Sequence, residues 1–409
     1  MSKSWDIKGA PGAMRTRNPI REIVDTMRLQ GSADKPVIPL SIGDPTVFGN
    51  LPFSESVSNA VISAVKGGES NGYVPAVGIE ATRAAIAERF SRDGAELTAQ
   101  DVVLASGASG ALDLALCALC SSERNDNILL PSPGFSLYST LCERYGVEIR
   151  KYPLVPEQDW NVDVAAMEAL IDENTRAILV NNPSNPCGSV YSAEHLREIL
   201  AVAEKHCLPI ITDEIYADMV FSGETFVPMA SLTSEVPILS VGGLAKQFLV
   251  PGWRMGWVLI HDRHGRFAEV RAALAKLATL ILGPNSLCQA AIPEIFSETE
   301  PEFYAELNAT LERHTKLLVD RIAAIPGLTP IVPKGAMYLM IKVDIAKFRN
   351  INNDVDFARR LLNEQFVFVL PGKCFGADNF FRVVTCPPPE KLAEACDRIA
   401  AFCSDNYIA

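Results

Sequence analysis

Residues 240–256 read Ser240-Val-Gly-Gly-Leu-Ala-Lys246-Gln-Phe-Leu-Val-Pro-Gly-Trp-Arg254-Met-Gly256. The amine of Lys246 lies in an apolar, glycine-rich loop, and Arg254 follows directly before an apolar run typical of a strand. A lysine that is shielded from water beside a second cation loses its proton more easily and becomes a Schiff-base nucleophile. The planar fork of an arginine suits a phosphate dianion. An aldehyde cofactor that carries a phosphate, such as pyridoxal 5′-phosphate (PLP), would use both groups, but a lone lysine is more often a solvated surface residue.

A second motif, Thr-Asp-Glu-Ile-Tyr at residues 212–216, closes the apolar run 208–211, which has the length and β-branched content of a strand. Asp213 therefore falls at the carboxyl end of a strand, where open α/β sheets bind their ligands. A buried carboxylate there is suited to a protonated pyridine nitrogen, and Tyr216, three residues further on, could reach the phenolic oxygen of the same ring. Alone, the motif also fits an N-cap aspartate followed by a packed tyrosine.

The third motif, Asn-Asn-Pro-Ser-Asn-Pro-Cys-Gly at residues 181–188, follows the strand-like run 176–180. Two Asn-Pro steps bias the backbone away from helix and toward fixed turns. Such a stiff loop is suited to aiming a side-chain amide at a ligand, and Asn185 is the candidate. A plain connection between a strand and a helix would favour the same residue types.

Residues 106–110, Ser-Gly-Ala-Ser-Gly, lie between the apolar run 102–105 and the helical stretch 111–119. A small-residue turn at the start of a helix exposes backbone N–H groups that cradle phosphate. The turn matches neither the dinucleotide fingerprint nor the P-loop, and it lacks the nucleophile elbow of serine hydrolases. By itself it is weak support for a phosphate site.

Together these motifs resemble the aminotransferases of PLP fold type I, within the aspartate aminotransferase family. The resemblance runs from Arg17-Asn-Pro-Ile-Arg21 to Arg382 and beyond, and residues 242–257 look most like the tyrosine branch of the family. It implies an α/β fold with a mostly parallel mixed sheet covered by helices and a smaller α+β domain.

The resemblance also implies roles for individual residues. Lys246 would form the Schiff base with PLP and later carry the 1,3-proton, Asp213 would hold the pyridinium, and Tyr216 with Asn185 would bind the phenolic oxygen. The remaining cofactor-binding residues that it implies are Gly107, Ala108, Ser109 and Arg254 at the phosphate, Phe135 on the ring face, and Tyr73 at the phosphate of a neighbouring subunit.

Two residues would bind the substrate. Arg382 matches the arginine that holds the α-carboxylate, and Gly43 resembles the backbone that closes over it. From the residues alone, a buried arginine in the apolar strand 380–384 needs an anionic partner, and an internal ion pair would serve equally well. Without the resemblance, Tyr73 and Phe135 would be interpreted as packed aromatic residues, and Gly43 as part of a turn without a binding role.

The chain departs from many relatives near the lysine. Ala245 and Gly243 stand where serines often contact the phosphate, so phosphate binding would rest more on Ser109, Arg254 and backbone groups. No arginine matches the one that dicarboxylate-specific enzymes direct at a distal carboxylate, because residues 281–287 are uncharged. Strict selectivity for aspartate is therefore not expected.

Length and patterning predict two domains. The chain has 409 residues with 48% apolar content, enough for a large core. Strand-like runs alternate with helical stretches from about residue 100 to 280, whereas later residues predict an α+β arrangement.

With the resemblance, we expect an N-terminal arm with part of the small domain at 1–45, a large PLP-binding domain at 46–294 and a small domain at 295–409. The expected elements are helices at 193–206 (N-cap Ser192), 265–280, 301–324, 355–365 and 389–404, with strands at 338–343 and 380–385.

Charge and composition exclude several classes of protein. A net charge of −12 argues against nucleic acid or an anionic membrane as partner. No apolar run has membrane-spanning length, and the start of the chain has no apolar secretory core, so a cytoplasmic location is expected, with mitochondria left open. Ten scattered cysteines fit free thiols in a reducing compartment, and no metal site is predicted.

The predicted reaction is reversible transfer of an α-amino group from an amino acid to a 2-oxo acid, ping-pong through pyridoxamine phosphate. Tyrosine and other aromatic or neutral amino acids are the expected donors, with 2-oxoglutarate or pyruvate as acceptor. The alternatives are an alanine or broad-specificity aminotransferase and a PLP-dependent carbon–sulfur lyase on the same fold. A homodimer with shared active sites is implied by the resemblance.

Overall fold

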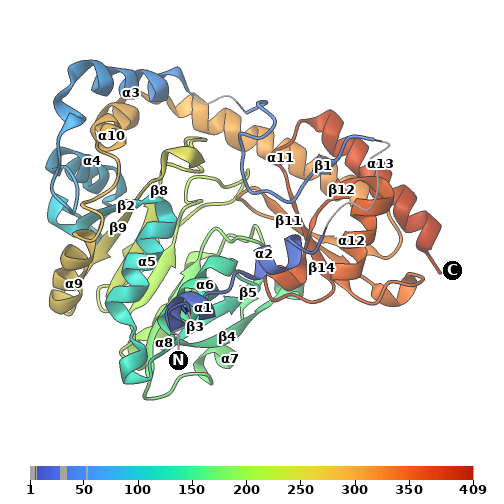
Figure 1. Cartoon of the computed structure of the whole chain (residues 1–409), viewed down its shortest axis with the longest axis horizontal. Coiled ribbons are helices and arrows are strands. Elements are labelled where there is room, and N and C mark those ends of the chain that lie inside the picture. Colours follow the sequence, from blue (N-terminus) through green and yellow to red (C-terminus); the bar gives the residue numbers. More distant parts are fainter. Residues whose placement is uncertain (1–4, 6, 28–34, 52–53, 409) are drawn as a thin grey trace.

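An eight-stranded mixed sheet forms the centre of the larger part of the molecule (Figure 1). Its strands run in the order β2-β9-β8-β7-β6-β3-β4-β5, and the five from β8 to β4 are parallel to their neighbours. The strands are β2 Val102–Ser106, β3 Asn127–Ser132, β4 Glu148–Val155, β5 Asn161–Val162, β6 Thr175–Asn181, β7 Ile210–Asp213, β8 Ile238–Gly243 and β9 Met255–His261. Because β9 is antiparallel to both β2 and β8, the sheet is mixed but mostly parallel.

This computed structural model describes residues 5, 7–27, 35–51 and 54–408. Part of the predicted N-terminal segment 1–45, namely residues 1–4, 6 and 28–34, therefore lies outside the described residues. The helices are α1 Pro11–Arg15, α2 Pro19–Val24, α3 Glu55–Gly67, α4 Glu80–Phe90, α5 Gly107–Leu119, α6 Ser136–Tyr145, α7 Val164–Glu168, α8 Ala193–Lys205, α9 Ala268–Ala278, α10 Ser286–Glu298, α11 Pro301–Ala323, α12 Asp354–Gln365 and α13 Pro389–Asn406.

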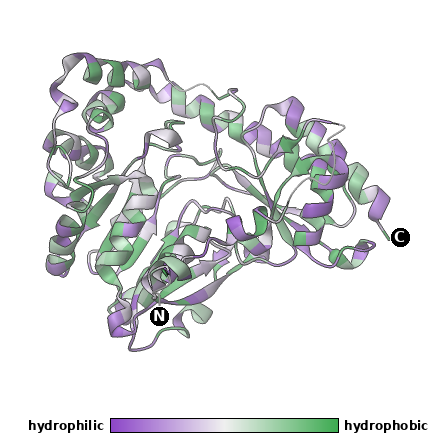
Figure 2. Cartoon of the chain, in the orientation of Figure 1, coloured by the Kyte–Doolittle hydropathy of each residue, from purple (hydrophilic) through white to green (hydrophobic). Residues whose placement is uncertain are grey.

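Helices cover both faces of the large sheet, because its central strands carry apolar side chains on both faces. Along β6, Ile178 and Val180 pack against α8, whereas Ala177 and Leu179 pack on the opposite face with α5, α6 and α9. This alternation follows from the two-residue period of a strand, and burial on both faces is typical of parallel sheets. Figure 2 shows the sheet strands as largely hydrophobic, whereas hydrophobic and hydrophilic segments alternate along the helices.

A four-stranded antiparallel sheet forms the second part, in the order β10-β11-β14-β13. Its strands are β10 Leu328–Ile331, β11 Tyr338–Val343, β13 Leu370–Pro371 and β14 Phe380–Val384. α11, α12 and α13 supply the core that covers this sheet. The N-terminal β1 Ile38–Pro39 pairs in parallel with β12 Val367–Phe368, and the Leu40 carbonyl accepts from the N–H of Val384. The residues after β1 are thereby held beside β14.

The fold class predicted from the sequence is confirmed. The predicted helix 193–206 is α8, and the side chain of its N-cap Ser192 accepts from the N–H of His195 at 3.1 Å. The helix expected at 265–280 is shorter, because residues 262–267 form a turn in which Asp262 accepts from two backbone N–H groups. The boundary expected between residues 294 and 295 falls within α10, and the domain boundaries stay predictions.

Within the described residues, none of the helices combines the length and apolar character of a membrane span. All ten cysteines are free thiols, and seven of them are buried.

Candidate active site

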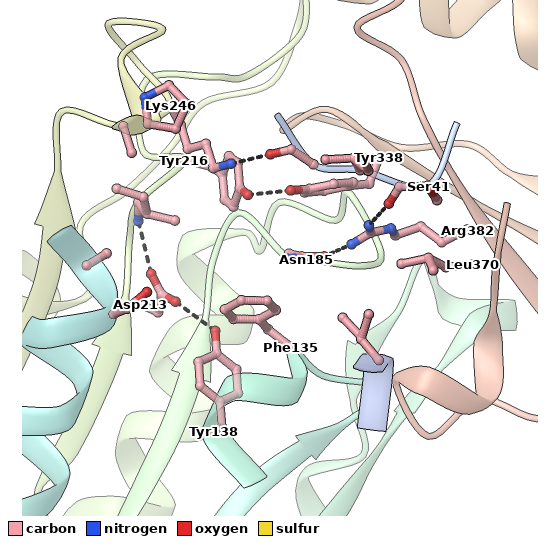
Figure 3. Close-up of a pocket in the computed structure, with 18 of the residues that line it drawn as sticks. Ser41, Phe135, Tyr138, Asn185, Asp213, Tyr216, Lys246, Tyr338, Leu370 and Arg382 are labelled. Carbon is pink, nitrogen blue, oxygen red and sulfur yellow. Dashed lines mark hydrogen bonds between the residues drawn. The ribbon is translucent and has the colours of Figure 1, made fainter. Parts of the chain in front are cut away.

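A cavity of about 420 Å³ lies where the large sheet, the antiparallel sheet and the N-terminal segment meet. It is at the carboxyl ends of the parallel strands, the position at which sheets of this kind bind ligands. Figure 3 shows residues from all three parts facing it. Among its lining residues are ten of those predicted from the sequence: Gly43, Ala108, Ser109, Phe135, Asn185, Asp213, Tyr216, Lys246, Arg254 and Arg382.

Lys246 lies in the turn that follows β8, half-buried against the N-terminal segment. Its Nζ donates a hydrogen bond of 2.5 Å to the carbonyl of Gly43, and Figure 3 shows the amine directed into the cavity region. The amine is therefore held by a backbone acceptor rather than by a carboxylate. A neutral acceptor leaves the nitrogen free to react once the contact opens.

Arg254 and Gly107 form an anion-binding arrangement at the start of α5. Gly107 has φ +70°, and a Cβ added there would lie 2.6 Å from Nη2 of Arg254, so only glycine lets the guanidinium come this close. The free N–H groups of the first helical turn, which includes Ala108 and Ser109, add partial positive charge. The described hydrogen bond of the Arg254 side chain goes to the carbonyl of Pro251, at 3.0 Å, so the guanidinium keeps donors for a phosphate.

Asp213 ends β7 and is almost fully buried. Its Oδ2 accepts from the hydroxyl of Tyr138 at 2.8 Å, and its Oδ1 accepts from the N–H of Ile215 at 3.3 Å. Burial raises the pKa of the Asp213 carboxyl to about 6, even though the Tyr138 hydrogen bond acts to lower it. A carboxylate in this state is suited to a buried cationic partner such as a protonated ring nitrogen.

The loop after β6 carries Asn185 and is fixed by a second asparagine. Asn181 donates from Nδ2 to the carbonyl of Asp213 at 2.9 Å, and its Oδ1 accepts from the N–H of Asn185 at 2.7 Å. The Asn185 amide is thereby aimed across the cavity, where its Oδ1 accepts from Nη1 of Arg382 at 2.8 Å. These two hydrogen bonds of Asn181 hold the loop in the fixed conformation that its Asn-Pro steps predict.

Arg382 is 3% exposed in the middle of β14. Besides Asn185 it donates to the carbonyl of Ser41, and its guanidinium carbon lies 4.4 Å from the ring centroid of Tyr338 and 4.6 Å from that of Phe375. Nε has no partner among the described residues, and no carboxylate of that part of the chain forms an ion pair with the group. Burial lowers the pKa of Arg382. The internal ion pair considered for this residue is thus not found, and the site suits an external carboxylate.

Two predicted residues lie outside the lining of the cavity. Gly107 is buried directly behind Arg254, as its close approach requires. Tyr73 is 94% exposed, and its predicted contact with a neighbouring subunit stays a prediction. Phe135 lines the cavity at the start of α6, with its ring edge-to-face on Tyr138 at 5.7 Å between centroids.

Four polar residues that line the cavity were not singled out from the sequence. Tyr138 lies three positions after Phe135 in the same motif, so helical spacing was a usable signal for it. Tyr338 and Ser41 had no comparable signal, because their partners in the cavity are remote in the chain, and Arg21 lies among the apolar residues of α2 without a local motif. Among the described residues no cluster of three or more histidine, cysteine, aspartate and glutamate side chains is arranged for a metal ion.

The cavity thus combines an amine, a buried carboxylate and the guanidinium groups of Arg21, Arg254 and Arg382. These groups suit a phosphorylated aldehyde with a basic ring nitrogen: Lys246 for the aldehyde, Asp213 for the ring nitrogen and Arg254 for the phosphate. Arg382 remains available for a second, carboxylate-bearing molecule.

Comparison with known proteins points the same way. Residues 35–399 match the family model described as "Aminotransferase class I and II". The tyrosine aminotransferase of Mus musculus is 49% identical over 404 residues, which are 98% of this chain and 88% of the mouse protein. That of Dictyostelium discoideum is 46% identical over 409 residues, 99% of this chain and 98% of the relative. The crystal structure of tyrosine aminotransferase from Leishmania infantum superposes with a TM-score of 0.95 at 35% identity, covering 99% of this chain and 100% of that one.

The raised pKa of Asp213 predicts that cofactor binding depends on pH. Below about pH 6 the free protein takes up a proton at Asp213 and loses the charge that attracts a ring cation. The affinity for pyridoxamine 5′-phosphate, which forms no covalent bond with Lys246, should weaken by up to about tenfold per pH unit there. Titrations followed by fluorescence between pH 5 and 8 measure this.

Tyr138→Phe is the matched variant, because losing its hydrogen bond removes a contribution that lowers the pKa of Asp213. The loss of affinity should then begin at a higher pH than in the wild type. Ionisation of the ligand itself is common to both proteins and cancels in the comparison. Superimposable pH profiles would contradict this role of Tyr138.

Proposed function

The chain belongs to the class I and II aminotransferases, a PLP-dependent family, and we propose that its amino donor is tyrosine, with other aromatic or neutral amino acids also accepted. A 2-oxo acid such as 2-oxoglutarate or pyruvate is the acceptor. The single observation that carries the proposal is the buried Arg382, which has no ion-pair partner among the described residues and lies in the same cavity as Lys246.

The described residues fit PLP as the cofactor. Arg254 and the α5 N-terminus behind Gly107 would hold its phosphate, Asp213 its ring nitrogen, and Tyr216 with Asn185 its phenolic oxygen. Phe135 would cover one face of the ring. When bound, PLP supplies the carbonyl that receives the amino group and an electron sink for the Cα electron pair.

The protein itself orients the substrate, through Arg382, and transfers one proton, through Lys246. Lys246 is the base that takes the proton from the substrate Cα, because its amine faces the cavity and has to leave only the Gly43 carbonyl to reach that proton. Arg382 fixes the α-carboxylate and therefore the direction of the Cα–H bond. Placing the bond to be broken beside a base is worth several orders of magnitude in rate.

The pocket for the substrate side chain is mostly apolar. It is lined by Ile20 and Val24 of α2, Ile42, Phe368 and Leu370. These surfaces suit an aromatic or neutral side chain. Arg21 of the same helix lines the cavity as well, and a guanidinium there supports acceptance of 2-oxoglutarate as the partner 2-oxo acid, whose distal carboxylate it would bind.

A homodimer is part of the proposal. Tyr73 is 94% exposed, and Leu280, Ile281 and Leu282 are large apolar residues more than half exposed in one run. Consecutive exposed apolar side chains are typical of a surface covered by another chain. A second copy of this chain would cover them and bring Tyr73 to its cofactor.

Donor preference is tested by following transfer from tyrosine, alanine and aspartate to 2-oxoglutarate. Because the side-chain pocket is apolar, kcat/KM should be highest for tyrosine and lowest for aspartate. Aspartate turned over far faster than tyrosine would refute the assignment. Release of pyruvate and ammonia from a β-substituted amino acid, without any added 2-oxo acid, would indicate the alternative carbon–sulfur lyase.

Lys246→Ala should lower turnover by at least about 10³-fold, because the cavity then lacks its nucleophile and base. PLP should still bind through Asp213 and Arg254, without the borohydride-stable bond that peptide mass mapping locates at Lys246 in the wild type. Lys342→Ala, an exposed lysine paired with Glu157, is the matched control and should keep wild-type rates. Labelling at a different lysine would overturn the assignment.

Arg382→Leu should lower kcat/KM for every amino acid alike by roughly 10- to 100-fold, because the α-carboxylate common to them loses a charge-assisted bond. Its thermal midpoint should change little, since an unpaired buried charge is removed. The control Arg398→Leu removes a buried arginine that pairs with Glu394, and should reduce stability while KM stays unchanged. A loss confined to one donor would show that Arg382 binds a side chain instead.

A further inference from the structure

Two tyrosine hydroxyls meet at the junction of the two sheets. Tyr216 belongs to the turn after β7, and Tyr338 is the first residue of β11. Their oxygens are 2.7 Å apart, and both side chains are buried, with ring planes at 83° and centroids 5.7 Å apart (Figure 3). This bond joins the large sheet to the antiparallel sheet inside the cavity.

The number of protons fixes the direction of this hydrogen bond. A phenol has one O–H, so it donates to one acceptor at a time. The inference rests on the proposed function, in which Tyr216 donates to the phenolic oxygen of PLP. If Tyr216 donated to Tyr338 instead, it would have no proton left for the cofactor. Tyr338 must therefore be the donor and Tyr216 the acceptor in the bond between them.

The surroundings of Tyr338 fit it for this role. The guanidinium carbon of Arg382 lies 4.4 Å from its ring centroid, and a cation over a phenol ring draws electron density from it and strengthens the O–H as a donor. A Cβ at Gly43 would lie only 2.5 Å from the Tyr338 hydroxyl, so the backbone of the N-terminal segment closes directly over the oxygen. Pairing of Tyr338 with Val384 fixes the start of the strand next to Arg382.

We propose that Tyr338 is a positioning residue that donates its hydroxyl proton to Tyr216 and so fixes the Tyr216 hydroxyl toward the cofactor. A hydroxyl that accepts one hydrogen bond becomes a better donor in the next, because successive bonds polarise each other. Tyr338 would therefore strengthen the bond from Tyr216 to the phenolic oxygen without touching PLP itself.

The readout is the pH midpoint of the visible absorbance of bound PLP. A strong donor at the phenolic oxygen stabilises its negative charge and favours the deprotonated form of the bound cofactor, which lowers the midpoint. Tyr338→Phe keeps the ring over Arg382 and removes only the hydroxyl. The midpoint should rise by about half a pH unit. Affinity for 3-phenylpropionate, a carboxylate without an amine, should stay within about twofold because the ring–guanidinium contact remains.

Tyr152→Phe is the matched control. Its hydroxyl is equally buried and donates to the carbonyl of Leu179 at 2.7 Å, but Tyr152 does not line the cavity. This variant removes the same group at similar burial, so it reports the general effect of losing a buried phenol and should leave the midpoint unchanged. A midpoint in Tyr338→Phe equal to the wild type, or an equal rise in Tyr152→Phe, would overturn the inference.

Two further proteins separate this inference from the proposed function. Wild type must bind PLP with a pH-dependent absorbance, and Tyr216→Phe must raise the midpoint by more than Tyr338→Phe does. Absence of either result refutes the proposed role of Tyr216, and the inference with it. A raised midpoint in Tyr216→Phe together with a wild-type midpoint in Tyr338→Phe refutes the role of Tyr338 alone.

Discussion

The guanidinium of Arg382 is buried with no carboxylate partner in the described part of the chain, and burial of an unpaired ion costs several kcal/mol. Contacts from three parts of the molecule offset this cost. Asn185 reaches it from the large sheet, the Ser41 carbonyl from the N-terminal segment, and the rings of Tyr338 and Phe375 from the smaller part. Keeping this cation buried therefore requires all three parts to be docked, and the same docking forms the cavity.

Charges of opposite sign share the cavity without neutralising each other. Asp213 is bonded to Tyr138 and a backbone N–H, while Arg382 is bonded to an amide and a carbonyl. Neutral partners hold both groups in place and leave their charges available to ligands. A direct ion pair between the two would have stabilised the empty cavity at the expense of binding. The arrangement therefore favours recognition of a zwitterionic substrate and a charged cofactor over stability of the protein alone.

The sequence was most informative where chemistry and local structure coincide. The strand–turn–helix at Gly107, the strand end at Asp213 and the loop of Asn185 were predicted because each combines a local pattern with a reactive residue type. The family resemblance added Arg382, for which the residues alone left an internal ion pair open. Tyr338 was missed because its hydroxyl partner is 122 residues away, and no local periodicity encodes such a contact. The helix expected from residue 265 begins at Ala268, because Asp262 caps a turn there.

The span between Ser41 and Arg382 has a consequence for synthesis of the protein. The hydrogen bond between them joins residues 341 positions apart, and β14 is the next-to-last element of the chain. During synthesis, Lys246 and the turn at Gly107 are therefore added before Arg382, the residue proposed to bind the substrate carboxylate. A chain that has not yet reached β14 cannot form this hydrogen bond, so the cavity is completed only once that strand has been synthesised.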